Sequence, residues 1–152
     1  MMQPPRATPA PYRLLHWLPA LAWASVIFAG SSVPGSQIPG GFAELGHLIE
    51  YAILGGLLVF ALWRGLPADA GRVAWTVIAL CALYGLSDEF HQAFVPMRTP
   101  DALDWATDVV GASVGLAVAL LASARAAKRR PSGLVDEVAP EEPTASSESR
   151  SG

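Results

Sequence analysis

The chain has 152 residues, of which 52% are hydrophobic and 15% charged, and its mean hydropathy is positive at +0.37. This composition is more apolar than that of a typical small soluble domain and indicates a membrane protein. The formal net charge of -3 gives no support for nucleic-acid binding. The single cysteine, Cys81, has no partner within the chain for a disulfide.

The chain starts with a proline-rich stretch followed by an apolar one. Residues 1–13 combine prolines with two arginines, and we expect a flexible tail there. Leu14–Gly30 is just long enough to cross roughly 30 Å of hydrocarbon as a helix. A cleaved signal peptide is the alternative, since positive residues precede this segment and small residues follow it. Its length and the proline in its middle, Pro19, favour a retained helix.

Three further apolar segments each predict a membrane-spanning helix. After a Ser-, Pro- and Gly-rich loop, Leu45–Trp63 forms the second helix and Val73–Phe94 the third. The fourth begins with Thr99 as N-cap and Pro100 in the first helical position, and it runs to about Ala124. We therefore predict an all-α fold, a four-helix integral membrane bundle.

Positive charges predict the orientation of residues 14–124, the predicted membrane domain. With four crossings, the N-terminal tail, the 64–72 loop and residues 125–152 share one side and hold all of the ten Lys and Arg residues except Arg98. The positive-inside rule then places both termini in the cytoplasm. We interpret residues 125–152 as a basic anchor followed by a disordered tail rich in Pro, Ser and Glu.

This topology brings carboxylates of three helices to one depth. Glu50, Asp88 and Asp108 each lie about 10 Å from the outer end of their helix. An unpaired charge at the centre of a spanning helix costs roughly 3 kcal/mol, so these groups should face one another or a wet pocket. On the fourth helix, Gly111 and Gly115 form a small-residue stripe that lets a neighbouring helix approach closely.

The polar residues resemble the signature of a known family. His47 opens the run HLIEYAIL, and Ser87 opens the run SDEFHQAFVP, which Arg98 and Asp104 follow. Over roughly residues 14–122 these motifs resemble the VanZ-like membrane proteins. The resemblance implies a multi-pass protein of the bacterial cytoplasmic membrane, in a family named for resistance to the glycopeptide teicoplanin. The signature positions it implies are His47, Tyr51, Asp88, Glu89, His91, Gln92, Arg98 and Asp104.

The sequence departs from that family pattern at three positions. Glu44 stands where we expect Lys, Met97 where Gly is usual, and Asp108 where Asn is common. Together these differences make the outer site more acidic than the pattern implies. Our candidate site adds two carboxylates to the signature residues and consists of His47, Glu50, Tyr51, Asp88, Glu89, His91, Gln92, Arg98, Asp104 and Asp108.

Two functions suit such a site. The first is a non-enzymatic envelope protein whose outward acidic pocket binds a lipid headgroup, a cell-wall precursor or an amphiphilic antibiotic such as a glycopeptide. The same residues could equally form a structural network that specifies helix packing. The second is an intramembrane enzyme in which Asp88 orients His91 as a base and Arg98 holds a phosphate or carboxylate. We predict no metal and no cofactor, the lipid bilayer as the surrounding partner, and an oligomeric state that stays open.

Overall fold

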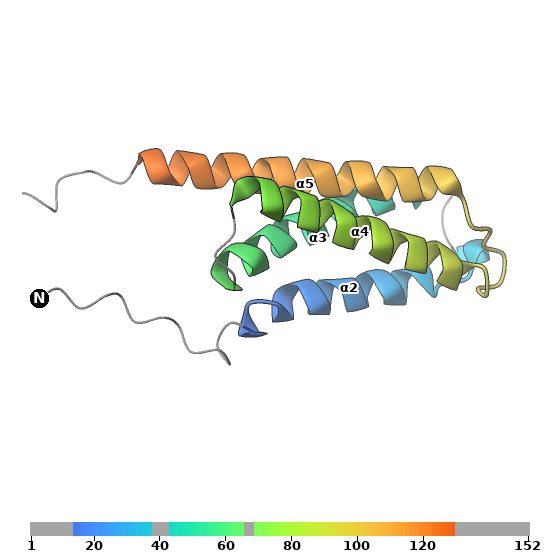
Figure 1. The fold of residues 1–152 in the computed structure, drawn as a ribbon. Coiled ribbons are helices and arrows are strands. Elements are labelled where there is room, and N and C mark those ends of the chain that lie inside the picture. The colour runs from blue at the N-terminus through green and yellow to red at the C-terminus, as the bar shows by residue number, and fades with distance from the viewer. Residues whose placement is uncertain (1–13, 38–42, 66–68, 130–152) are drawn as a thin grey trace, which may run out of the picture.

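The structure is a computed structural model that describes residues 14–37, 43–65 and 69–129. Within these ranges every regular element is helical, and four α-helices run up, down, up and down beside one another (Figure 1). The helices are α2 (Leu18–Ser31), α3 (Ala43–Gly65), α4 (Ala70–Gln92) and α5 (Ala102–Lys128), with a short 3-10 helix at Gly35–Gln37. This confirms the predicted all-α, four-helix fold.

Three of these helices, α3, α4 and α5, are long and apolar enough to span a membrane, and α2 is a shorter apolar helix. The 14 residues of α2 cover about 21 Å, less than the roughly 30 Å of a hydrocarbon core. The helix starts at Leu18 rather than at the predicted Leu14, because a separate turn closed by Trp17 N–H and the Leu14 carbonyl precedes it. Pro19 thus lies in the first turn of α2, where its missing N–H costs nothing, and does not interrupt a helix.

The ends of α5 differ from the prediction. Its N-cap is Asp101 rather than Thr99, because the Asp101 carboxylate accepts a hydrogen bond from Leu103 N–H at 2.8 Å. A carboxylate also suits the positive end of the helix dipole better than a hydroxyl does. At the other end the helix continues beyond the predicted Ala124 to Lys128. The predicted tails at residues 1–13 and 130–152 lie outside the described residues.

Helices α3 and α5 form a very close contact, and the neighbouring helix that the glycine spacing of α5 predicted is α3. A Cβ atom on Gly55 would lie only 2.6 Å from the Ala112 carbonyl oxygen. Three such approaches follow one another along the interface, Gly55 against Ala112, Gly111 against Leu48, and Gly115 against Ala52. The backbones of α3 and α5 therefore touch directly. Small residues stabilise helix pairs in a membrane in this way, because the hydrophobic effect does not drive helices together in lipid.

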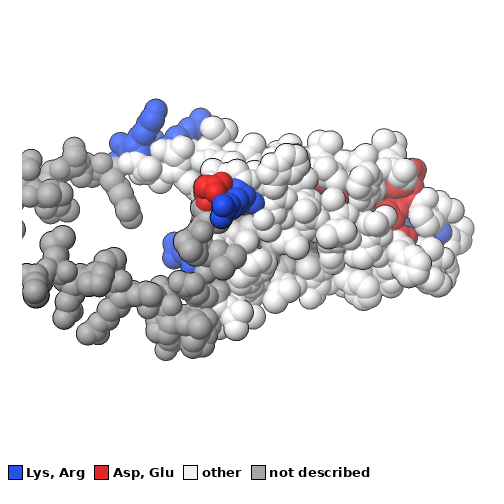
Figure 2. Space-filling model, in the orientation of Figure 1, with Lys and Arg blue, Asp and Glu red and all other residues white. Residues whose placement is uncertain are grey.

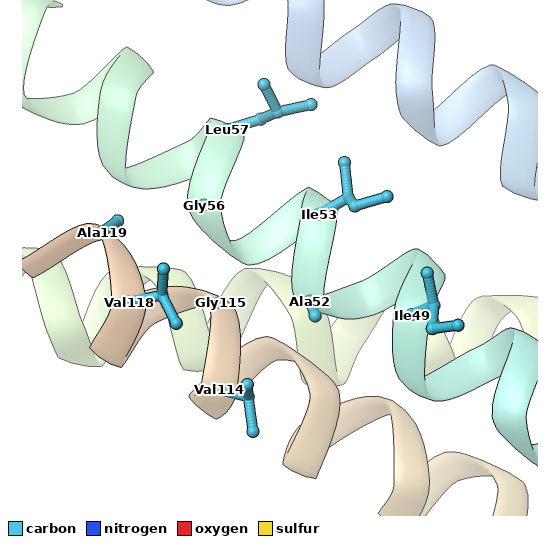
Figure 3. A pocket seen from close by; sticks show the side chains of 9 residues that line it. All are labelled: Ile49, Ala52, Ile53, Gly56, Leu57, Val114, Gly115, Val118 and Ala119. Carbon is cyan, nitrogen blue, oxygen red and sulfur yellow. The ribbon is translucent and has the colours of Figure 1, made fainter. Parts of the chain in front are cut away.

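A shallow apolar groove lies on the surface between α3 and α5, shown in Figure 3. Gly56 and Gly115 form its floor, and Ile49, Ile53 and Val118 are among the side chains along it. No polar side chain lines it, so we assign it no part in the site described below.

Helix α2 is attached to the bundle differently, through long-range hydrogen bonds. Trp23 Nε1–H donates to the Glu50 carbonyl oxygen at 2.9 Å, and Tyr84 O–H donates to the Ala24 carbonyl oxygen at 2.6 Å. Only Ala20, Ile27 and Ser31 of α2 are buried. Most of α2 therefore faces outward, and α3, α4 and α5 supply most of the core.

Most basic residues of the described helices lie at one end and most acidic ones at the other (Figure 2), with Asp69 beside Arg72 as an exception at the basic end. Arg64, Arg72 and the basic residues of the last turns of α5 lie at the end where α2 begins. The buried acidic residues and Arg98 lie at the other end. This arrangement agrees with the predicted grouping of charges, whereas the cellular side of each end stays a prediction.

Candidate functional site

The ten predicted residues all lie at one end of the bundle, opposite the basic end. They come from the start of α3, the end of α4 and the turn after it, and the start of α5. The buried members are His47, Tyr51, Asp88, Glu89, Gln92 and Asp108. Glu50, His91, Arg98 and Asp104 are half-buried. The hydrogen bonds divide these residues into separate groups.

The deepest group is a His–Asp pair that joins α3 to α5. His47 Nδ1 lies 2.9 Å from Asp108 Oδ1, and the two residues are 5% and 0% exposed. The other carboxylate oxygen of Asp108 has no hydrogen-bond partner and points at α4, where a Cβ on Gly85 would lie 2.8 Å away. Asp108, which differs from the family pattern, is thus matched to His47 and to the missing side chain of Gly85.

The second group centres on Asp88 and joins α2, α4 and the turn that follows α4. Asp88 Oδ2 accepts hydrogen bonds from Ser31 Oγ at 2.7 Å and from Gln92 Nε2 at 3.1 Å. Arg98 in turn donates from Nε to the Val33 carbonyl oxygen at 3.3 Å and from a terminal nitrogen to Gln92 Oε1 at 3.5 Å. Asp88 Oδ1 has no partner. The network therefore leaves an acceptor free.

His91 does not pair with Asp88, contrary to the predicted oriented base. Asp88 bonds to Ser31 and Gln92, while His91 stacks on Phe28 with ring centroids 4.3 Å apart. His91 Nε2 lies 3.1 Å from Ser32 Oγ, but that hydroxyl already donates to the Phe28 carbonyl oxygen at 2.7 Å. Because a hydroxyl has one hydrogen, Ser32 accepts from His91 in this arrangement.

Glu89 turns away from Asp88, because neighbouring residues of a helix point in different directions. Its Oε2 accepts a hydrogen bond from Asp101 N–H at 2.7 Å, just before α5 begins. Its Oε1 has no partner, although the residue is only 6% exposed. Glu89 therefore belongs to the α4–α5 side of the bundle.

Two aromatic residues lie beneath these groups. Tyr51 is fully buried with its ring centroid 6.1 Å from that of Tyr84, and its hydroxyl has no partner. Glu50 is held through its backbone carbonyl, which accepts from Trp23 Nε1–H. Asp104 lies in the first turn of α5.

Sequence reasoning missed the contribution of α2. The run of serine, proline and glycine that begins at Ser31 and Ser32 predicts a loop. In the structure Ser31 ends α2 and bonds to Asp88 across 57 positions of sequence. The signal that could have shown this was the serine pair directly at the end of an apolar segment.

Four buried polar atoms of the site lack a hydrogen-bond partner. They are the Tyr51 hydroxyl, Asp88 Oδ1, Glu89 Oε1 and Asp108 Oδ2. Buried polar groups are nearly always paired, so Tyr51, Asp88 and Glu89 each have an atom that water or a ligand would satisfy, whereas Asp108 Oδ2 packs against Gly85. Across the described ranges no three His, Cys, Asp or Glu side chains come together in a way that could hold a metal ion.

An all-helical membrane protein with ionisable side chains buried at one end of its bundle is the class defined by this fold and site. A model of the VanZ/LLP1 family matches residues 8–123, and the chain belongs to that family. Searches of curated proteins and of solved structures found no match.

One departure from the family pattern, Met97, coincides with a left-handed backbone conformation. Met97 has a φ of 57°, the only positive φ of a non-glycine residue in the described part of the chain. The turn it occupies is tied down on both sides, since Arg98 N–H donates to the Val95 carbonyl oxygen and Gly35 N–H donates to the Pro96 carbonyl oxygen. A left-handed backbone favours glycine, the residue we expect here from the family pattern.

Proposed function

We propose that this protein acts in the bacterial cell envelope, where its polar end binds an amphiphilic or lipid-linked ligand and contributes to tolerance of teicoplanin. The proposal takes the positive-inside orientation, with the basic end in the cytoplasm and the polar end under the outer surface of the cytoplasmic membrane. A ligand arriving from the cell-wall side would then meet the polar end first.

The observation that carries the proposal is the set of unpartnered buried atoms. Three of the four are carboxylate oxygens. An ionised carboxylate accepts hydrogen bonds but cannot donate them. The guanidinium at this end, Arg98, is already directed at Val33 and Gln92. A ligand with ammonium or hydroxyl groups would complement this excess of acceptors.

An apolar cavity below Asp88 supports an amphiphile over a purely polar ligand. About 190 Å³ of space lies between α2, α3 and α4, lined by apolar side chains such as Leu54, Leu58 and Leu80. Tyr84, one helical turn from Asp88 along α4, is among its lining residues. The space is too small for a whole lipid and suits part of one chain.

Expression in a sensitive host tests the proposal. Cells with the wild type, Asp88→Asn, His91→Ala or an empty vector are compared for susceptibility to teicoplanin, with vancomycin as comparator and protein levels matched. Glu44→Gln is the control, because it removes an exposed carboxylate from the first turn of α3 at the same end. We expect teicoplanin-selective protection by the wild type and the control and its loss in the two site variants. No protection by a well-inserted wild type would contradict the resistance role.

The alternative of an intramembrane acid/base enzyme has less support. The base it required, His91 oriented by Asp88, does not form, and His91 donates to the nearest hydroxyl rather than taking its proton. Lipid analysis of the same cells tests this alternative, since a catalytic role would produce a new lipid species that Asp88→Asn abolishes.

A further inference from the structure

The surface between α4 and the start of α5 carries a recess that is separate from the Asp88 network. Its larger part encloses about 620 Å³, and a smaller part continues toward the N-terminus of α5. Both parts are lined by Leu86, Glu89 and Pro100. Two acidic residues line the recess, the buried Glu89 in both parts and the exposed Asp101 in the smaller part, and the rest of its lining is mostly apolar.

Glu89 is the buried polar residue of this recess, whereas Ser87 and Asp101 in its lining are exposed. Glu89 is 6% exposed, its Oε2 accepts the Asp101 N–H, and its Oε1 has no partner. Arg98 bonds to Val33 and Gln92, so its hydrogen bonds serve other groups. A buried carboxylate oxygen without a donor is costly unless something outside the chain supplies one.

The apolar walls show which way a ligand would lie. Leu83, Leu86 and Phe90 are 65%, 60% and 69% exposed, and their spacing of three and four residues places them along one face of α4. Glu89 lies three residues before the end of α4, roughly 5 Å from that end, and Leu83 lies deeper in the span. A headgroup at Glu89 would therefore have its acyl chain against Leu86 and Leu83.

We propose that this recess is a binding site for a phospholipid with a primary ammonium headgroup, the chemistry of phosphatidylethanolamine. The ammonium donates a charge-assisted hydrogen bond to Glu89 Oε1, and one acyl chain lies along α4. A bare divalent cation does not fit, since it needs six or more oxygen ligands and the walls here are apolar. A choline headgroup has no N–H and cannot satisfy Oε1. This site shares Glu89 Oε1 with the set of atoms on which the proposed function rests, but its test measures lipid retention and does not depend on glycopeptide protection.

Lipid retention by the purified full-length protein tests the site. The protein is incubated in mild detergent with equal amounts of phosphatidylethanolamine, phosphatidylcholine and phosphatidylglycerol that carry the same acyl chains, and bound lipid is counted by native mass spectrometry. We expect the wild type to retain phosphatidylethanolamine over phosphatidylcholine by about threefold to tenfold, the size of one partly screened charge-assisted contact. Equal retention of the two lipids would overturn the proposal.

Two variants and a control locate the effect. Glu89→Gln should reduce the ratio to that of equal retention, and Ser87→Phe should lower retention of the favoured lipid by filling the recess from its exposed edge. Glu44→Gln removes a carboxylate at the same end of the bundle and should keep the wild-type ratio. If Glu89→Gln kept the wild-type preference for phosphatidylethanolamine, Glu89 would serve only to accept the Asp101 N–H. If Ser87→Phe kept the wild-type retention, the lipid would bind elsewhere. Either result overturns the site. Circular dichroism and size-exclusion chromatography establish folding, and if Glu89→Gln fails them the wild type and Ser87→Phe decide.

Discussion

The α3–α5 pair and helix α2 are held in the same bundle by different forces. Between α3 and α5 the backbones touch at three glycines, and the buried His47–Asp108 pair joins the helices at their polar ends. Helix α2 instead contributes few buried residues and is held by hydrogen bonds from or to Trp23, Ala24 and Ser31. The first contact is determined by shape and the second by a few individual bonds.

This difference indicates that the α3–α5 pair and α2 have different structural roles. A contact made by backbone against backbone has one register and resists change, because nothing in it can move to a second rotamer. A helix held by separable hydrogen bonds can shift at a cost of a few such bonds. The α3–α5 pair therefore provides the frame, and α2 is the element that could adjust around a ligand between it and the frame.

The largest effect is expected from Gly115→Leu. The new side chain would meet the backbone of Ala52, which cannot move aside as a side chain could. Overpacking typically costs 1–3 kcal/mol, and a backbone clash at the tightest contact should cost at least about 3 kcal/mol. Unfolding in a detergent titration and the amount of protein in the membrane measure the loss. Gly46→Ala is the control, since a Cβ at Gly46 meets nothing within 4 Å, and a similar loss there would refute the explanation.

An effect of comparable size is expected from the removal of one partner of the buried pair. Asp108→Ala leaves His47 buried without its carboxylate, and breaking a buried pair in this way costs about 3–5 kcal/mol. Asp108→Asn should cost less, because an amide oxygen can still accept from His47 Nδ1. The double-mutant cycle with His47→Ala gives the pair's own coupling. Additive losses would show that the two side chains act independently, against the 2.9 Å contact.

The sequence predicted most of the frame and little of the attachment of α2. Apolar segment lengths predicted the helices, and the spacing of Gly111 and Gly115 predicted a close approach of some helix to α5, because both are local patterns with a direct structural meaning. That this helix is α3 came only from the structure. The pairing of Ser31 with Asp88 depends on how two distant helices rotate against each other, and no local pattern contains that rotation.

The same reason explains why the site was found as a group but not in its connections. Topology and depth along the helices placed Glu50, Asp88 and Asp108 at one end of the bundle, but helical angles could not say that Asp108 would pair with His47. They also suggested that Asp88 faces His91, whereas Gln92 one turn away on the same helix and Ser31 from α2 occupy its oxygen. Partner choice among several polar neighbours depends on distances of a few tenths of an ångström, which a sequence does not specify.

The attachment of α2 should respond to loss of a single hydrogen bond. Tyr84→Phe removes the bond to the Ala24 carbonyl and should lower stability by about 0.5–1.5 kcal/mol. Because the contact is local, hydrogen exchange should rise in α2 while α3 and α5 keep their protection. Ser25→Ala serves as the control, since that exposed hydroxyl bonds only to Leu21 within α2. Faster exchange spread evenly over all helices would show that α2 is part of the frame.

The smallest effect is a gain, at the turn between the Asp88 network and the start of α5. Met97→Gly removes the cost of a left-handed backbone at φ 57°, and a gain of about 0.5–1 kcal/mol remains after the extra freedom of glycine in the unfolded chain is counted. Met97→Ala retains the Cβ atom and the strain, so the same detergent titration should show no gain for it. Because the Met97 side chain is 79% exposed, the comparison isolates the backbone from packing. Equal stability of the glycine and alanine variants would mean that the bonds around this turn, rather than the residue at its centre, set its conformation, and that methionine is tolerated there without cost.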